Sequence, residues 1–171
     1  MIDAAETALI EPALEYCFEL RVDVADALPM GGSTEGEGLH FAPITGGAFE
    51  GPRLRGRILP GGGDWWHGRG LTVRLDARYV IEAEVRGDEH RNGEPARAAI
   101  DVVNRGYWRT DPESFERMLA GEAVDERDLY YRTAFTFQTE HPALQWLAES
   151  QFVGYARPEP GRVVIRVFRL A

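Results

Sequence analysis

Cysteine is almost absent from this sequence: Cys17 is the only one in 171 residues. A single cysteine cannot form a disulfide within the chain, so nothing points to an oxidising compartment. We interpret Cys17 as chemically inert, because no histidine lies near it in the sequence to activate the thiol.

Long apolar runs and basic residues are also scarce. No stretch approaches the roughly 18 consecutive apolar residues that a membrane helix needs. Lysine and arginine together number 19 against 28 aspartates and glutamates, which gives a net charge of −9. Because nucleic acids and anionic membranes attract basic surfaces, this balance argues against either as a partner. Residues 1–15 are too acidic, and too interrupted by Pro12, for a signal peptide, so we expect a cytoplasmic protein.

The remaining composition is typical of one globular domain. Hydrophobic residues make up 44% of the chain and charged residues 27%, and a chain of this length can bury a single sizeable core. We therefore expect one domain over residues 1–171, in which residues 1–12 form an N-terminal arm.

Alternation of apolar and polar residues is the strongest structural signal. Residues 14–24 and 71–86 alternate without a break, as half-buried strands do. Six further strand candidates have the same pattern over shorter stretches: 39–44, 53–59, 98–105, 129–140, 152–156 and 163–170. Their short connections favour antiparallel pairing, and eight strands close into a barrel that holds packed side chains or one small ligand. The sequence thus predicts an all-β fold, a closed eight-stranded antiparallel β-barrel of lipocalin-like architecture.

One short helix interrupts the strands. Asp111 can cap it, Pro112 suits its first turn and Gly121 can end it. Residues 142–149 are expected to add one or two helical turns. We interpret residues 25–38 as a loop and residues 87–97 as a polar hairpin turn, because both are rich in residues that favour turns.

The segment Gly61-Gly62-Gly63-Asp64-Trp65-Trp66-His67 carries the main chemical hypothesis. We interpret it as a glycine-rich turn at the mouth of the barrel. Large apolar rings beside Asp64 would remove its hydration and move its pKa toward the range of a general acid or base. Trp65 and Trp66 would line the substrate pocket. The alternative is that Asp64 only hydrogen-bonds its own turn.

Arg132 is the candidate for holding developing negative charge on a substrate. The alternative is a surface salt bridge with Glu140 or Asp76, which would contribute about 0–1 kcal/mol. The alternation alone leaves open which face of its strand lines the interior.

Several aromatic and polar residues lie in the apolar register of their strands. Tyr16, Tyr79 and Tyr131 would fill the interior, and each hydroxyl needs a partner. Asn104 shares the apolar side of its strand, so it either ends the strand or is buried with a partner. We expect Tyr131 to pass a proton with Asp64, and the other three to bind substrate; packing of the tyrosines in the core is the alternative.

The four histidines are scattered, without the spacing of a helix-borne metal site. No phosphate-binding glycine motif precedes a helix. We therefore expect neither a metal nor a cofactor. His40 is included among the substrate-binding candidates, and His67 is notable only because it lies three residues from Asp64.

Ordered sequence blocks resemble the domain-of-unknown-function family 3237, also called uncharacterised protein family 0311. The blocks are Pro43-Ile44-Thr45-Gly46-Gly47-Ala48-Phe49-Glu50-Gly51-Pro52, Leu59-Pro60-Gly61-Gly62-Gly63-Asp64-Trp65, Leu75-Asp76-Ala77-Arg78-Tyr79, Asn104-Arg105-Gly106-Tyr107, Tyr131-Arg132-Thr133 and Trp146-Leu147. The resemblance runs from about Leu14 to the C-terminus. It implies a small antiparallel barrel similar in architecture to allene oxide cyclase and dirigent proteins. The sequence departs from the family pattern at Gly63, His40, Gln138 and Ala148, which suggests a specialised member.

Three hypotheses of function follow. The first is a cofactor-independent isomerase, cyclase or lyase that transfers protons on a hydrophobic small molecule inside the barrel. The second is a non-catalytic barrel that binds or carries such a molecule. The third is a homo-oligomeric structural protein in which the aromatic segment around Trp66 is an interface.

Overall fold

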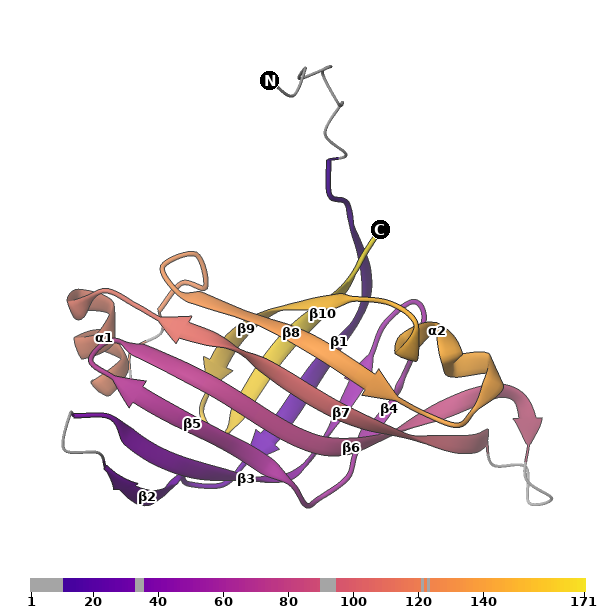
Figure 1. Ribbon diagram of the computed structural model, residues 1–171, viewed down its shortest axis with the longest axis horizontal. Helices are drawn as coiled ribbons and strands as arrows, with labels where there is room; N and C mark the ends of the chain where they lie inside the picture. The colour runs from indigo at the N-terminus through magenta and orange to yellow at the C-terminus, as the bar shows by residue number, and fades with distance from the viewer. Residues whose placement is uncertain (1–10, 33–35, 90–94, 121, 123) are drawn as a thin grey trace, which may run out of the picture.

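The computed structural model describes residues 11–32, 36–89, 95–120, 122 and 124–171. In chain order its elements are β1 (Leu14–Val24), β2 (Leu28–Gly32), β3 (Gly38–Glu50), β4 (Gly56–Ile58), β5 (Gly63–Arg69), β6 (Thr72–Glu89), β7 (Pro95–Arg109), α1 (Pro112–Leu119), β8 (Tyr130–Gln138), η1 (Pro142–Leu144, a 3₁₀ turn), α2 (Gln145–Ala148), β9 (Phe152–Glu159) and β10 (Arg162–Leu170). Figure 1 shows the strands wrapped around one interior, with α1 and α2 at opposite ends.

The strands close into a barrel with eight positions around its wall. Consecutive strands from β6 to β10 pair as antiparallel neighbours, and β1 closes the ring by pairing with both β10 and β3. On the other edge of β3, β4 and β5 lie end to end, and both pair with β6. β2 continues the position of β1 beside β3. The predicted closed eight-stranded antiparallel barrel is therefore confirmed, although ten separate strands build it.

Three local predictions were wrong. β2 lies within residues 25–38, which were expected to be a loop. β3 does not stop at Thr45 but continues through Gly46 and Gly47, both at positive φ. A Cβ at Gly47 would overlap the carbonyl of Arg21 on β1, so the close approach of the two strands requires glycine there. The expected strand at 53–59 is limited to the three residues of β4.

The segment that follows the three glycines is a strand rather than a turn. β5 pairs with β3 on one side and with β6 on the other, from Gly63 to Arg69. Gly61 and Gly62, at positive φ, make the turn that precedes it. The segment therefore belongs to the barrel wall, and alternate side chains along it face opposite sides.

A β-bulge in β1 changes which side chains face inward. The register with β10 shifts between Tyr16 and Phe18, and both Cys17 and Phe18 are fully buried. Tyr16 is left on the outside, 40% exposed, where its ring lies 5.6 Å from that of Phe168. The expectation that Tyr16 faces the interior is wrong, because the bulge reverses the alternation at that point.

The interior is divided into an apolar half and a polar half. Toward α2 it is filled by aromatic rings with centroids 5.1–6.1 Å apart: Phe18, Phe49, Phe137 and Phe152. Leu147 of α2 is buried against this cluster. Toward α1 the inward-facing side chains include aspartate, tyrosine, asparagine and threonine. Burial of the apolar half stabilises the barrel and leaves the polar half for other chemistry.

The predicted helix and the outer salt bridges are also present. Asp111 caps α1 by accepting a hydrogen bond from the Ser114 backbone N–H at 2.9 Å. Outside the barrel, Asp76 pairs with Arg105 and Arg78 pairs with Asp101. The middle of the expected hairpin turn (residues 90–94), the expected helix end at Gly121, and residues 1–10 of the expected N-terminal arm lie outside the described residues. In the described part of the chain, no helix is both long and apolar enough to cross a membrane.

Candidate functional site

Strand register places Asp64 and Trp66 of β5 on the inner face of the barrel. Asp64 lies opposite Ala77 of β6, and Trp66 lies opposite Leu75. Both β6 residues are buried in the core. Since residues directly opposite one another in a sheet share a face, the Asp64 and Trp66 side chains point inward as well.

Asp64 titrates in an unusual range. Burial removes water from its carboxyl group and raises the pKa from 3.8 to about 6. A hydrogen bond from the Asp76 backbone N–H to Oδ1, at 3.0 Å, acts in the opposite direction, while the charge of Asp76 raises the pKa further. A carboxyl group with a pKa near 6 can both hold and release a proton close to neutral pH.

Tyr79 and Tyr131 lie close enough to Asp64 to interact with its charge. Both rings are buried, and burial is the main reason why the pKa of each phenol is raised above its usual value. The negative charge of Asp64 raises both further, and the proximity of Tyr79 adds to the effect at Tyr131. The two phenols therefore keep their protons at neutral pH and act as hydrogen-bond donors.

Asn104 occupies the centre of the same wall. It lies opposite Ala77 on one side and Phe135 of β8 on the other, and is only 5% exposed. Its placement in the apolar register therefore means burial in the strand rather than a strand end.

Four inward-facing polar atoms are buried without a hydrogen-bond partner among the described residues: His40 Nδ1, Tyr79 Oη, Asn104 Oδ1 and Thr133 Oγ1. They come from four strands, β3, β6, β7 and β8. An unpaired buried polar group costs about 1–3 kcal/mol, so a cluster of them is typical of a site that receives hydrogen bonds from a bound molecule.

Thr133 was not among the sequence candidates. It follows Arg132 on β8, lies opposite Gly106 of β7 and Gly154 of β9, and is 5% exposed. The sequence contained a signal for it, because Thr133 shares the apolar register of Tyr131 and Phe135. A threonine at such a position places a hydroxyl group in the core, where an aliphatic side chain is usual.

His40 and Trp66 form one wall of the site. The residues are opposite each other on β3 and β5, and their rings stack with centroids 3.9 Å apart and planes 6° apart. Trp66 packs against the core. This arrangement disfavours the hypothesis that Trp66 forms an interface between subunits, since its ring is directed into the barrel.

Arg132 is on the outside of the barrel, which contradicts the expectation that its side chain reaches a substrate in the interior. Its neighbours Tyr131 and Thr133 face inward, so alternation directs Arg132 outward. The guanidinium lies 4.1 Å from the ring centroid of Tyr155 and 5.5 Å from that of Tyr130. It borders an outer hollow of about 510 Å³. The interaction is a cation–π contact rather than the expected salt bridge.

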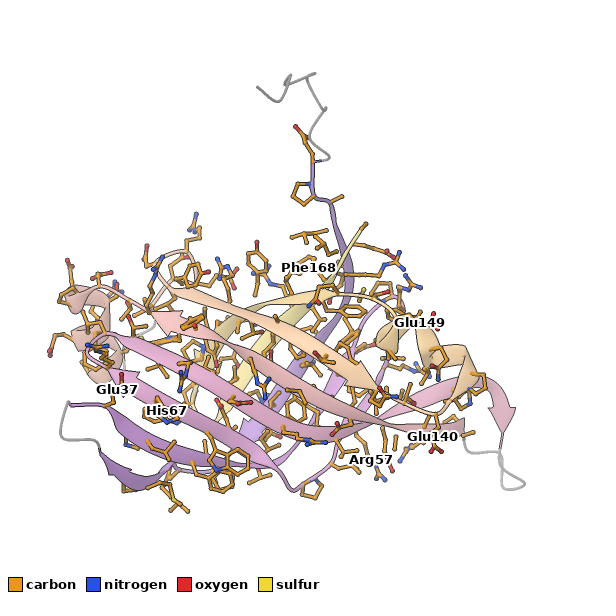
Figure 2. The ribbon with its side chains drawn as sticks, in the orientation of Figure 1. Glu37, Arg57, His67, Glu140, Glu149 and Phe168 are labelled. Atoms are coloured by element: carbon orange, nitrogen blue, oxygen red, sulfur yellow. The ribbon has the colours of Figure 1, made fainter. Side chains whose placement is uncertain are left out.

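Trp65 also faces outward, which corrects the expectation that it lines the pocket. It lies opposite the exposed Asp76, is 42% exposed, and its ring centroid is 4.6 Å from that of Phe41. His67, two residues on and labelled in Figure 2, shares this outer register. Among the described residues, no three His, Cys, Asp or Glu side chains gather as metal ligands do.

Fold and interior together define a class: a small closed antiparallel barrel whose polar half, in the described part of the chain, presents the Asp64 carboxyl group, two phenols and unpaired amide and hydroxyl groups. The family model "Protein of unknown function (DUF3237)" matches residues 12–170, and the chain belongs to this family. The resemblance seen in the sequence blocks is thereby confirmed.

Relatives of similar length share the whole barrel. A UPF0311 protein of Rhodopseudomonas palustris (strain TIE-1) is 32% identical over 163 residues, which are 93% of this chain and 98% of that protein. A crystal structure of a β-barrel-like protein from Acinetobacter baumannii has 27% identity and a TM-score of 0.77, covering 97% of this chain and 100% of the other. A conserved protein of unknown function from R. palustris has 30% identity and a TM-score of 0.78, covering 95% and 99%.

One structural neighbour is described as an enzyme, from Penicillium herquei. It has a TM-score of 0.67 and 19% identity, covering 96% of this chain and 98% of its own. This similarity extends to the fold alone.

Proposed function

We propose that this protein is a cofactor-independent enzyme that transfers protons on a small, largely apolar molecule held in the polar half of the barrel. The observation that carries the proposal is the position of Asp64: a carboxyl group with a pKa of about 6, inside the barrel, beside two protonated phenols. Strongly shifted carboxyl groups in interiors are typical of acid–base catalysts.

The chemical roles follow from the protonation states. Above pH 6 Asp64 is a carboxylate and can remove a proton from a carbon or hydroxyl group of the substrate. Tyr79 and Tyr131 would donate hydrogen bonds to the oxygen on which negative charge develops, which is the role first expected of Arg132. Asp64, once protonated, can return the proton to another atom of the same molecule. An isomerase, cyclase or lyase can be built on this sequence of steps.

The remaining inner residues would hold the substrate. The stacked rings of His40 and Trp66 provide a flat wall, against which an apolar molecule can pack. Asn104 and Thr133 each present a buried oxygen that can orient a substrate hydroxyl.

The experiment is a solvent-exchange screen. Apolar carbonyl compounds are incubated with the protein in D₂O and followed by liquid chromatography and mass spectrometry. The expected result is deuterium uptake or conversion of at least one compound, reduced at least 100-fold in Asp64→Asn, since a positioned general base contributes roughly 10²–10⁴ in rate. Asp101→Asn, a carboxylate on the outer face, is the matched control and should behave as wild type. Equal rates in wild type and Asp64→Asn would overturn the proposal.

The second candidate is a non-catalytic binding barrel. The four unpaired buried polar atoms favour it, since a bound molecule could satisfy them without any reaction. It predicts that a ligand binds without deuterium uptake or conversion, and that Asp64→Asn retains binding. Exchange that depends on Asp64 would exclude it.

A further inference from the structure

Among the described residues, no arginine faces the polar half of the barrel interior. The chain contains no lysine, so its 19 basic residues are all arginines. Among the strand residues whose side chains the structure describes, the arginines are on the outer face except Arg169, which lies opposite the buried Phe152 at the apolar end of the barrel and pairs with Glu15. Many of the outer arginines make ion pairs or ring contacts there, for example Arg57 with Glu82, Arg78 with Asp101, Arg105 with Asp76, and Arg132 with Tyr155.

Asp64 is the one described carboxyl group that faces the polar half, and it lies opposite Ala42 and Ala77 rather than a cation. Among the described residues, the hydrogen bond to the Asp64 carboxyl group comes from the backbone N–H of Asp76. An anionic ligand placed beside it would be repelled when Asp64 is ionised, and no described arginine in the polar half would offset that repulsion. A neutral ligand would meet no such penalty.

The unpaired atoms add a second requirement. Asn104 Oδ1 accepts hydrogen bonds, as does the Asp64 carboxylate, so a ligand must bring a donor to that part of the wall. The hydroxyl of Tyr79 is buried and unpaired, and Tyr131 lies beside it, so a ligand must also bring an acceptor. A hydroxyl and a carbonyl on one small molecule meet both requirements.

We infer that the site selects an uncharged compound with a carbonyl group directed at Tyr79 and Tyr131 and a hydroxyl group directed at Asp64 and Asn104, and that it rejects carboxylates and phosphates. The inference rests on the interior site of the proposed function and names the class of its substrate. It concerns binding, so it holds whether or not the bound molecule is converted.

Two probes of nearly equal shape test it. 2′-Hydroxyacetophenone carries a hydroxyl and a methyl ketone on one ring, and salicylate replaces the ketone with a carboxylate. Equilibrium dialysis at pH 8, followed by absorbance, measures the affinity of each probe for the wild type, Asp64→Asn, Asp64→Ser and Asp101→Asn. Near-ultraviolet circular dichroism confirms that each variant is folded, and the second substitution at Asp64 serves if the first does not fold.

The wild type should bind the ketone at least 10-fold more tightly than salicylate. Both Asp64 variants should narrow this ratio at least three-fold, because they remove the repulsive charge, while Asp101→Asn should leave it unchanged. Equal or tighter binding of salicylate, an unchanged ratio in the Asp64 variants, or no binding of the ketone up to its solubility limit would overturn the inference. None of these outcomes depends on turnover. A failure here is therefore separate from equal exchange rates in wild type and Asp64→Asn, which is the result that would overturn the proposed function.

Discussion

Gly154 of β9 leaves the space that the Thr133 side chain of β8 occupies. The two residues are opposite each other on the inner face. A Cβ at position 154 would overlap Thr133 Oγ1 and lie 2.7 Å from Phe135 Cε2 and 2.9 Å from Ile165 Cγ2. On the other side of Thr133, a Cβ at Gly106 would lie 2.7 Å from Thr133 Cγ2. The Thr133 side chain is thus held between two glycines, with its hydroxyl toward Gly154 and its methyl group toward Gly106.

Replacing Gly154 with alanine should destabilise the protein by about 1–3 kcal/mol, the usual effect of adding a carbon to a packed interior. The loss is steric, because Gly154 is not among the residues with positive φ. Urea unfolding followed by circular dichroism measures it. Gly68→Ala is the matched control on β5, since its Cβ would meet Trp66 Cζ3 at 3.3 Å and no backbone. An effect at Gly154 no larger than that at Gly68 would contradict this packing.

Because the hydroxyl of Thr133 is unpaired, its removal should make the protein more stable and weaken ligand binding. Thr133→Val removes a buried group without a partner and keeps the shape of the side chain, so the free energy of unfolding should rise by about 1 kcal/mol. Affinity for the hydroxyketone probe should fall at the same time. Thermal or urea unfolding and equilibrium dialysis measure the two effects.

Thr139 is the control for that substitution. It is also 5% exposed, but its hydroxyl donates to the Ala99 carbonyl at 2.9 Å and accepts from the His141 N–H at 3.3 Å. Thr139→Val should therefore lower stability by roughly 1–2 kcal/mol. If both valine variants changed stability in the same direction, Thr133 would be an ordinary core residue rather than part of a site.

Much of the fold could be predicted because apolar side chains along each strand face the barrel interior. That rule also located Asn104, Tyr79 and Tyr131, which are polar or amphipathic residues in an apolar register. It would have excluded Arg132, which lies in the polar register of β8, had the same rule been applied to the site. The side chains of the polar half therefore come from polar or amphipathic residues at strand positions where the alternation predicts an apolar residue.

Three errors had different causes, and two of these, in β1 and β2, are not visible in a single sequence. The bulge at Cys17 reverses the alternation of β1, and only the pairing with β10 reveals it. β5 was mistaken for a turn because three glycines precede it, although Asp64 and Trp66 alternate with Trp65 and His67 as residues of a strand do. β2 contains a proline and two glycines, and its pairing with β3 is a tertiary effect that local composition opposes.

Arg132→Ala should have a small effect on stability and none on the interior. The guanidinium contacts the rings of Tyr155 and Tyr130 at the surface, and such contacts contribute about 0.5–1 kcal/mol. Binding of the hydroxyketone and any exchange activity should remain within two-fold of wild type. Arg132→Lys, which keeps the charge, should recover part of the stability. A loss of activity above 10-fold in Arg132→Ala would mean that the arginine acts on the site after all.

The pKa of Asp64 also predicts how stability depends on pH. In the unfolded chain this carboxyl titrates near 3.8, and in the folded chain near 6. As pH rises between these values the unfolded chain releases the proton first, so the free energy of unfolding falls through this window and is constant above it. A shift of about 2 pKa units corresponds to a loss of about 2.5 kcal/mol between pH 4 and pH 7.5, because the unfolded carboxyl is already partly ionised at pH 4. Asp64→Asn removes this loss and keeps an acceptor for the Asp76 N–H, so its stability relative to wild type should rise by that amount over the same interval. Urea unfolding of the wild type, Asp64→Asn and the outer-face control Asp101→Asn at pH 4, 5, 6 and 7.5 measures the difference, and parallel wild-type and Asp64→Asn curves would mean that this carboxyl group is solvated like any surface aspartate.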